Sequence, residues 1–175
     1  YSIYFDGQNN HVDLGNLELS SYSDFSFLTF FKTNNLENNS RGMIFSITDD
    51  GTSGGQAYNF AHFQIFIRDN NIWFSHGEDG NNDFNFGGNC ANNQWHSLAV
   101  ILNNQSGVIS VFLDGILLAQ HSVSINFDNL AMYSLGQEWD PGPSPSDFFD
   151  GYLDDVQILD DYLSASEVLN YINCP

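Results

Sequence analysis

Basic residues are nearly absent from this sequence. Lys and Arg together number 3, whereas Asp and Glu number 22, which gives a formal net charge of -19. A protein that binds nucleic acid needs basic side chains to neutralise phosphates, and anionic membrane surfaces likewise attract basic segments. We therefore expect neither as a partner. Self-repulsion destabilises a compact chain of this charge, so the acidity either serves solubility in a salt-rich medium or is relieved by a bound divalent cation.

Long apolar runs are also missing, and proline is scarce. No stretch of about 18 apolar residues occurs, so we expect no membrane insertion. Three of the 4 prolines fall within residues 141–145, between two strand-like runs, which indicates a loop. No linker or internal repeat divides the chain. With 175 residues and 42% hydrophobic composition, residues 1–175 suit one domain with one sizeable core.

Only two cysteines occur, Cys90 and Cys174. Two thiols cannot form a four-ligand zinc site on their own, and their spacing is not that of a C-x-x-C redox pair. In a secreted chain they would close a large loop, which is where a disulfide stabilises most in the chain-entropy model. We therefore predict a Cys90–Cys174 disulfide, with two unrelated buried thiols as the alternative.

Two Asn-x-Ser sequons, at Asn38 and Asn104, lie in polar, turn-like stretches. They are candidate N-glycosylation sites only if a eukaryotic cell secretes the chain. In an Asn-rich sequence such sequons also arise by chance.

Short strand-like segments separated by turns occupy most of the chain. Aromatic residues make up 15% of the sequence, and their rings favour strands and pack well between sheets. The pair Asp114-Gly115 predicts a tight hairpin, because both residues tolerate positive φ. A helix is predicted after Ser164, which has capping-box spacing with Glu167. The predicted strands are 2–5, 11–14, 25–33, 42–47, 62–67, 72–75, 95–102, 108–113, 116–121, 132–135 and one within 148–159.

About a dozen short strands and one terminal helix predict an all-β fold, a two-sheet antiparallel β-sandwich with a short C-terminal helix. Several motifs then occur in a fixed order, namely YFDG (4–7), WHSLAV (95–100), VFLDG (111–115), FDGYLDDVQI (149–158) and LSASEV (163–168). In this order the chain resembles the concanavalin A-like, laminin G-like group of jelly-roll sandwiches over nearly its whole length. The resemblance implies jelly-roll topology and an extracellular binding role.

Residues 135–140, Leu-Gly-Gln-Glu-Trp-Asp, are similar to the calcium-binding segment of pentraxins. In that family the acids of this segment, an earlier acidic pair and the following loop ligate calcium. Calcium takes about six to eight oxygen ligands. This chain departs from the pattern because Trp139 stands in place of an amide and the following loop is short and proline-rich, which favours one ion over two. The ligands that the resemblance implies are Asp49, Asp50, Glu138, Asp140 and Asp147; alternatively each acid only keeps its loop solvated.

A second candidate calcium site joins Asp6 to Asp154 or Asp155. Sandwiches of this group often hold a structural ion on that side, so the resemblance permits it. The alternative is a turn-forming Asp6 and an acid at a strand end. Residues 78–83 are also acidic, but they lack the Gly position and terminal Glu of an EF-hand, so a solvated loop is expected there.

We do not expect catalysis. Glycoside hydrolysis needs two positioned carboxyl groups, and here Glu138 and Asp140 are followed at once by Pro141 rather than by a second Glu on the same strand. Most aromatic rings are expected in the core. Trp139 is the ring we expect at the surface, where it could stack on a sugar, because it lies between two acids and beside a Pro-Gly loop.

Two functions follow from these patterns. The first is an extracellular calcium-binding recognition module for a glycan or another matrix or cell-surface ligand, with calcium bridging the carboxylates to the ligand. The second is a structural subunit of a calcium-stabilised extracellular fibre, matrix or adhesin assembly. The resemblance implies both classes, because pentraxins form rings and laminin G modules occur in matrix proteins.

Overall fold

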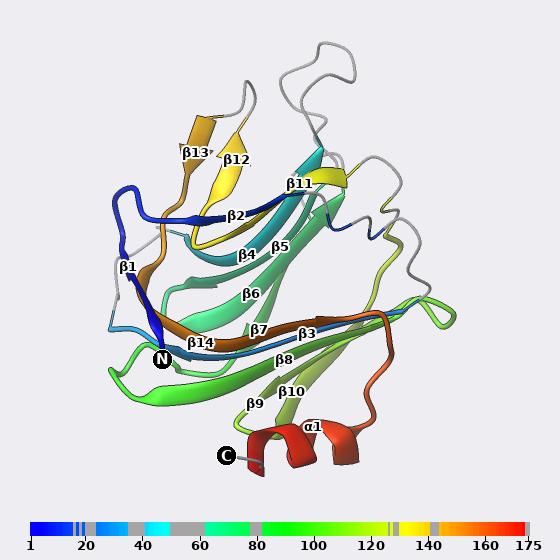
Figure 1. Ribbon diagram of the computed structural model, residues 1–175. Helices are drawn as coiled ribbons and strands as arrows, with labels where there is room; N and C mark the ends of the chain where they lie inside the picture. The colour runs from blue at the N-terminus through cyan, green and yellow to red at the C-terminus, as the bar shows by residue number, and fades with distance from the viewer. Residues whose placement is uncertain are drawn as a thin grey trace.

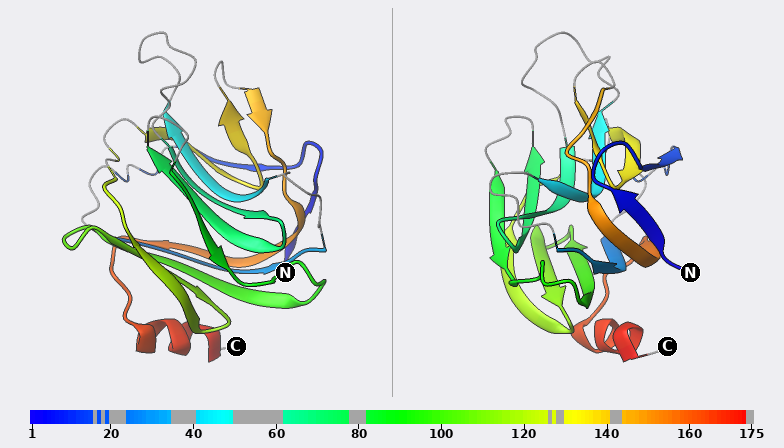
Figure 2. Two further views of the ribbon diagram at one scale, coloured as in Figure 1. Left: turned by 180° about the vertical axis from the view of Figure 1, so that it is seen from behind. Right: turned by 90° about the vertical axis from the view of Figure 1, so that its left-hand side faces the viewer.

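The computed structural model describes residues 1–15, 17, 19, 24–34, 41–49, 62–77, 82–125, 127, 130–140 and 144–173, with the backbone alone at positions 49 and 131. In these residues two six-stranded antiparallel sheets face one another, a two-stranded hairpin stands over one sheet, and a helix lies under the other (Figures 1 and 2). The predicted all-β sandwich with one C-terminal helix is confirmed.

The lower sheet in Figure 1, sheet A, joins the start of the chain to its last strand. Its order is β1-β14-β3-β8-β9-β10, and β1 pairs directly with β14. Such non-consecutive neighbours are typical of a jelly roll, whose strands return beside earlier ones. The bounds are β1 Ile3–Asp6, β14 Asp150–Leu159, β3 Phe25–Lys32, β8 Trp95–Asn103, β9 Val108–Leu113 and β10 Ile116–Ser122.

The upper sheet, sheet B, carries the hairpin. Its order is β2-β11-β4-β5-β6-β7. The hairpin of β12 (Glu138–Asp140) and β13 (Ser144–Ser146) leaves the end of β11 and stands above sheet B in Figure 1. The bounds in sheet B are β2 Val12–Gly15, β11 Leu130–Leu135, β4 Gly42–Asp49, β5 His62–Arg68, β6 Asn71–Gly77 and β7 Asp83–Gly87.

Phenylalanine rings fill the space between the sheets. The ring centroids of Phe27 in β3 and Phe45 in β4 lie 4.8 Å apart, so a ring of sheet A stacks on a ring of sheet B. Phe25 meets Phe63 edge to face at 5.2 Å, and Phe63 meets Phe74 at 4.9 Å. All five are fully buried. Such aromatic pairs contribute about 0.5–1.5 kcal/mol each beyond the area that they bury.

Helix α1 (Ala165–Asn173) covers part of the outer face of sheet A. Its buried Val168 packs with Leu28 and Ala99 in a second, smaller apolar cluster. The predicted capping box is present, because the Glu167 carboxylate accepts the Ser164 backbone N–H at 2.8 Å. This bond and the Ser164 hydroxyl hold the pKa of Glu167 below its usual value. Among the described residues there is no helix with the length and apolar character that crossing a bilayer requires.

Three strands were not predicted. β7 begins at Asp83, where a solvated loop was expected, β12 directly precedes the loop expected at residues 141–145, and β13 overlaps that loop. Each is short; β12 and β13 lack the alternating apolar pattern on which strand prediction rests, and the alternation in β7 (DFNFG) covers only five residues. Two of them form the hairpin that carries Glu138 and Asp140, so the sequence pattern was least informative where the candidate site lies.

The predicted disulfide joins Cys90 to a residue outside the described part of the chain. The Cys90 side chain is fully buried in the main core, and burial raises the pKa of its thiol to about 12. Cys174 follows the last described residue, Asn173, at the end of α1. The disulfide therefore stays a prediction.

Gly136 sets the direction in which the hairpin leaves sheet B. Its φ is +80°, and its N–H and C=O are bonded to Ile44 and Phe149 respectively. A Cβ at Gly136 would penetrate the ring of Phe5, which is 1% exposed. Glycine is therefore required here both for the backbone conformation and for space.

We predict that Gly136→Ala lowers the free energy of unfolding by about 2–4 kcal/mol, because it combines left-handed strain with overpacking. Gly15→Ala is the matched control: φ there is +66°, but a Cβ would meet nothing within 4 Å. The control should cost only about 1 kcal/mol. Equilibrium urea unfolding measures both, and equal costs would contradict the packing argument.

Candidate functional site

The β12–β13 hairpin brings two carboxyl groups together over sheet B. Glu138 in β12 is paired with Ser146 in β13, and Asp147 follows directly with φ of +50°. Asp140 is two residues beyond Glu138 and therefore on the same side of β12. The Ser146 hydroxyl lies 3.5 Å from Glu138 Oε1. The hairpin thus gathers three of the five acids that the pentraxin resemblance implied.

Glu138 is a largely buried carboxyl group in a crowded acidic setting. Burial and, to a smaller extent, the neighbouring Asp147 carboxyl raise its pKa to about 8, although Arg41 opposes the increase. The Asp147 carboxyl bonds to Glu138, and its own pKa is also raised by burial. The exposed Asp140 adds to the repulsion on both. Two such carboxyls must share a proton or a cation, since both cannot stay charged and desolvated.

The donor chemistry of this pair fits a hard cation such as calcium. Glu138, Asp147 and Asp140 supply carboxylate oxygens, and Ser146 supplies a hydroxyl, which are the ligand types that calcium prefers. The two carboxyls already touch, so the binding of an ion would replace repulsion with attraction. Within the described part of the chain, however, no three His, Cys, Asp or Glu side chains are grouped closely enough to hold a metal. Asp140 would have to turn inward to complete a site.

The other two implied ligands are not at the hairpin. The Asp147 carbonyl accepts the Met43 N–H at the start of β4, whereas Asp49 ends that strand opposite Leu130. The six residue steps from Met43 to Asp49 span roughly 20 Å in an extended strand. Asp50 lies outside the described residues. The structure thus separates Asp49 from the hairpin acids, because Asp49 is at the end of β4 and the hairpin contacts the beginning of that strand.

The second candidate calcium set is not assembled either. Asp6 pairs with Asp150, and Asp154 is four residues further along β14, roughly 13 Å away. The Asp6 carboxylate accepts the backbone N–H groups of residues 8–10, which lowers its pKa. Asp155 lies at a bulge of β14. Asp6 therefore acts as the turn-forming residue of the alternative interpretation.

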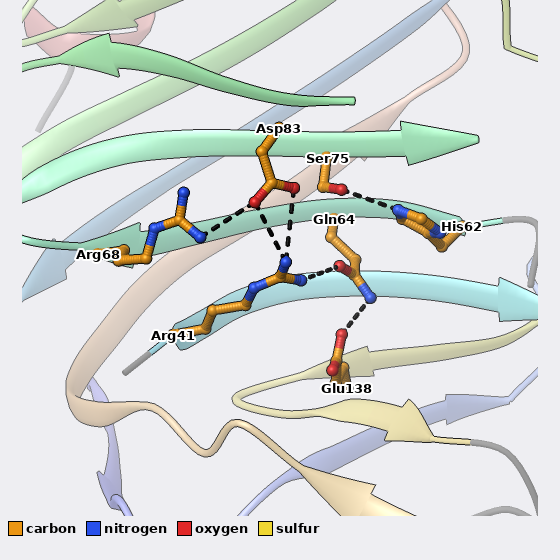
Figure 3. A network of polar contacts seen from close by, with 7 residues as sticks. All are labelled: Arg41, His62, Gln64, Arg68, Ser75, Asp83 and Glu138. Atoms are coloured by element: carbon orange, nitrogen blue, oxygen red, sulfur yellow. Dashed lines mark hydrogen bonds and ion pairs between the residues drawn. The ribbon is translucent and has the colours of Figure 1, made fainter. Parts of the chain in front are cut away.

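A polar network extends from Glu138 across the outer face of sheet B (Figure 3). The Gln64 amide donates to Glu138, and its oxygen accepts from Arg41 Nη1 at 3.2 Å. Arg41 and Arg68 both bond to Asp83, at 3.2 and 3.0 Å. The network thus links the hairpin to β5 and β7 through four side chains.

Two of these network residues, Gln64 and Asp83, belong to a row of polar side chains that crosses five strands. The register pairs Ser134 with Ser46, Ser46 with Gln64, Gln64 with Ser75, and Ser75 with Asp83. Successive positions of a strand alternate between faces, so this row shares the outer face while the phenylalanines face the core. His62, which precedes Gln64 by two residues in β5 and therefore shares its face, contacts the Ser75 hydroxyl at 2.8 Å.

Two hydroxyl groups on this face lack hydrogen-bond partners in the described structure. They belong to Ser46 and to Thr48, which pairs with His62 in the next strand. Both side chains are at least 98% buried. A buried hydroxyl without a partner costs about 1–3 kcal/mol, so these groups are costly unless they bind something.

Trp139 is partly buried rather than free at the surface. Its ring packs edge to face on His11 at 5.6 Å. With the Gln137 amide oriented to satisfy its neighbours, the Trp139 indole N–H donates to the Gln137 oxygen at 3.1 Å. Strand alternation puts the Trp139 side chain on the side of β12 opposite to Glu138 and Asp140, so its predicted ligand contact remains a proposal.

Exposed aromatic rings gather instead on the outer face of sheet A. The register aligns Tyr4, Tyr152, Lys32 and Trp95 across four neighbouring strands. Tyr4, Tyr152 and Trp95 are 53%, 38% and 45% exposed. The Tyr4 and Tyr152 rings lie 5.0 Å apart, and Trp95 lies 6.3 Å from Tyr152. This exposed aromatic row was not predicted, because strand registers cannot be read from one sequence.

Of the two sequons, Asn104 lies at an exposed turn between β8 and β9. Asn38 lies outside the described residues. The network residues Arg41, Gln64, Arg68 and Asp83 were not predicted as functional. The rarity of basic residues was the available signal, because two of the 3 cations are these arginines.

Comparison with solved structures supports the fold. The IT-sialidase CBM40 of Ruminococcus gnavus, solved bound to α2,3-sialyllactose, aligns with a TM-score of 0.71 at 16% identity, covering 99% of this chain and 98% of that one. A heptameric pentraxin from Limulus polyphemus aligns at 0.70 and 17%, covering 99% and 82%. NanB, solved with optactamide, aligns at 0.73 and 17%, covering 97% of this chain but only 27% of that one. This chain thus spans about a quarter of NanB.

At sequence level, no curated protein matches the chain. A laminin G-like family profile, described as the concanavalin A-like lectin/glucanases superfamily, matches residues 6–169. These residues include every strand from β2 to β14 and most of α1, so the match covers nearly the whole sandwich. The chain therefore belongs to the concanavalin A-like lectin/glucanases superfamily.

Proposed function

We propose that this chain is an extracellular recognition module that binds glycans with the help of a calcium ion at the β12–β13 hairpin. The observation that carries the proposal is the direct interaction between the partly buried Glu138 and Asp147 carboxyl groups beside Asp140. A protein keeps such a pair at a cost to stability, and a bound cation offsets that cost. The sialyllactose complex of the CBM40 module favours a glycan as the ligand class.

Four residues of the segment 138–147 have a role in this proposal. Glu138 and Asp147 would hold the ion, Asp140 would complete its carboxylate shell, and Trp139 would offer its accessible ring to the sugar. The ion would bridge protein carboxylates to ligand hydroxyl groups. Gln64 donates to Glu138 and thereby fixes the orientation of that carboxyl group.

Binding is favoured over hydrolysis, although the superfamily includes glucanases. Retaining glycosidases hold their two carboxyl groups about 5 Å apart on either side of the sugar bond, and inverting enzymes hold them further apart. The Glu138 and Asp147 carboxyl groups interact directly with one another, which does not match two groups that flank a sugar bond.

The extracellular setting rests on the laminin G-like resemblance. The Cys90–Cys174 disulfide and N-glycosylation at Asn104 belong to the same proposal, because both require secretion. Neither is needed for the hairpin to bind calcium.

The exposed aromatic row favours a second candidate, a subunit of a calcium-stabilised assembly. Tyr and Trp are enriched at protein interfaces, and exposed apolar patches mark interaction sites. Tyr4, Tyr152 and Trp95 would then contact a partner subunit. Light scattering with calcium and with excess chelator tests this candidate. A particle mass that rises with calcium would support assembly, and a monomer under both conditions would contradict it.

We predict opposite effects of Glu138→Gln with and without calcium. Because the pKa of Glu138 is higher in the folded chain than in the unfolded chain, its contribution is neutral below about pH 4.5 and becomes destabilising as the pH rises toward 8. Without metal at pH 8, Glu138→Gln should therefore stabilise the fold by about 1 kcal/mol or more. With calcium at a hundredfold excess over its dissociation constant, the unchanged protein should gain about 2.7 kcal/mol and the variant much less.

Thermal unfolding of the unchanged protein and of Glu138→Gln measures these stability differences. Each protein is unfolded at pH 5 and at pH 8, with calcium and with excess chelator. Asp160→Asn is the matched control, since it removes one exposed acid beyond the end of β14 and should keep the full calcium gain. A variant at Glu138 that keeps the calcium gain would refute the assigned ligand. No calcium gain in the unchanged protein would refute the metal site.

Glycan binding should depend on calcium. On a glycan array, the unchanged protein should bind a subset of glycans in calcium and release them in chelator, because the ion bridges ligand and carboxylates. Glu138→Gln should bind none of that subset, while Asp160→Asn should bind as the unchanged protein does. Absence of binding to every glycan in calcium would overturn the recognition function, and binding that persists in chelator would overturn the role of the ion.

A further inference from the structure

Both arginines of the chain converge on one point of sheet B. Arg41 lies just before β4 and Arg68 ends β5, and both contact Asp83 at the start of β7. The third cation, Lys32, lies on the outer face of sheet A. A chain with 22 acidic residues thus places two of its 3 basic residues within reach of one carboxylate.

The local charge at this point is opposite to that of the molecule. Two guanidinium groups face one carboxylate, so their sum is +1, while the whole chain carries -19. Gln64 stands between Arg41 and the hairpin, because its oxygen accepts from Arg41 and its amide donates to Glu138; Arg41 also attracts the Glu138 and Asp147 carboxyl groups. Calcium at Glu138 would compensate those acids and leave the arginine pair as an excess of positive charge.

Aromatic rings hold the two guanidinium groups in place. The Arg68 guanidinium carbon lies 3.7 Å from the centre of the Trp73 ring, and that of Arg41 lies 4.7 Å from the centre of Phe66. The Trp73 N–H donates to the Arg68 carbonyl at 2.9 Å, which fixes the ring beneath its own arginine. A guanidinium stacked on a ring keeps its edge donors free and loses little side-chain freedom on binding.

Donor capacity remains after the contacts with Asp83. A guanidinium has five N–H donors, and Arg68 uses Nη1 for Asp83. The side chains of Arg41 and Arg68 are 25% and 20% exposed, so ligand atoms can reach their edges. Two arginines side by side match a planar carboxylate better than lysines would, because each offers parallel N–H groups.

A second observation points to a ligand on the same face. The hydroxyls of Ser46 and Thr48 are buried without hydrogen-bond partners in the described structure, and Ser46 is directly opposite Gln64. Gln64 in turn contacts Arg41. The face therefore offers positive charge, a stacked ring and polar groups with unused hydrogen-bonding capacity, which together match a charged saccharide.

We propose that Arg41, Arg68 and Trp73 form a subsite for the carboxylate of an acidic saccharide. Gln64 lies between the hairpin and this subsite. One glycan would therefore contact the calcium ion through its hydroxyls and the arginine pair through its acid group. This inference rests on the proposed glycan-recognition function and adds the substrate class. Asp83 orients the two arginines in the absence of ligand.

The test compares an acidic sugar with its own methyl ester, which removes the charge and keeps the sugar. Isothermal titration in calcium would use 3′-sialyllactose and tri-galacturonic acid, each against its methyl ester. We expect at least one of the two acids to bind about 10- to 100-fold more tightly than its ester, as charge-assisted hydrogen bonds contribute that much. Added salt should narrow the difference, because screening weakens partly exposed ion pairs.

Variants separate recognition from structure. Arg68→Gln should reduce the affinity for the acid to that for the ester. Arg68→Lys should recover only part of the difference, because lysine restores the positive charge but lacks the parallel N–H donors of a guanidinium. Lys32→Gln removes the same charge from sheet A and should change neither affinity. Thermal unfolding with calcium checks that each variant is folded, and the acid–ester comparison on the unchanged protein decides the matter should Arg68→Gln fail to fold.

Equal binding of acid and ester, or an acid preference that survives Arg68→Gln, would overturn the subsite and identify the arginine pair as a structural tie between β4, β5 and β7. Glycan-array binding that persists in that case would leave the proposed function intact. An array on which neither acidic nor neutral glycans bind in calcium would overturn the proposed function itself, so the two failures are distinguishable.

Discussion

The interleaved phenylalanine rings between the sheets are the interaction on which the rest of this structure depends. Rings from β3 and β4 stack at 4.8 Å, and edge-to-face contacts continue through Phe63 to Phe74. This apolar layer occupies one face of sheet B, so the polar side chains at the alternate strand positions lie on the opposite face. The polar row from Ser134 to Asp83 is therefore a direct consequence of the core.

Charge is the second constraint. A net charge of -19 opposes compaction, yet the hairpin adds two touching, buried carboxyl groups to that burden. Arg41 offsets part of the repulsion and is itself tied to Asp83. Stability and binding are thus opposed at the hairpin: the arrangement that costs free energy in the metal-free chain is the one that gives a cation its affinity.

The fold was largely predictable from sequence because its signals are local. Turn residues such as Asp114-Gly115 and the capping box at Ser164 mark the ends of elements, and both are present in the structure. The site was predicted only in part. Glu138, Asp140 and Asp147 are close in sequence and share a hairpin, whereas Asp49 was placed with them although it ends a strand whose beginning meets that hairpin. The contacts of Arg41 and Arg68 with Asp83 depend on strand register, which no local pattern specifies.

Terbium luminescence tests the central claim, an ion at the β12–β13 hairpin, most directly. Terbium(III) takes the place of calcium among oxygen ligands and emits when an indole close to it is excited, and Trp139 lies between Glu138 and Asp140. The account predicts indole-sensitised emission that calcium competes away, that Trp139→Phe abolishes, and that Trp95→Phe, on the other sheet, preserves. Emission unchanged in Trp139→Phe would place the ion elsewhere, and the absence of calcium-competed emission from the unchanged protein would contradict the claim.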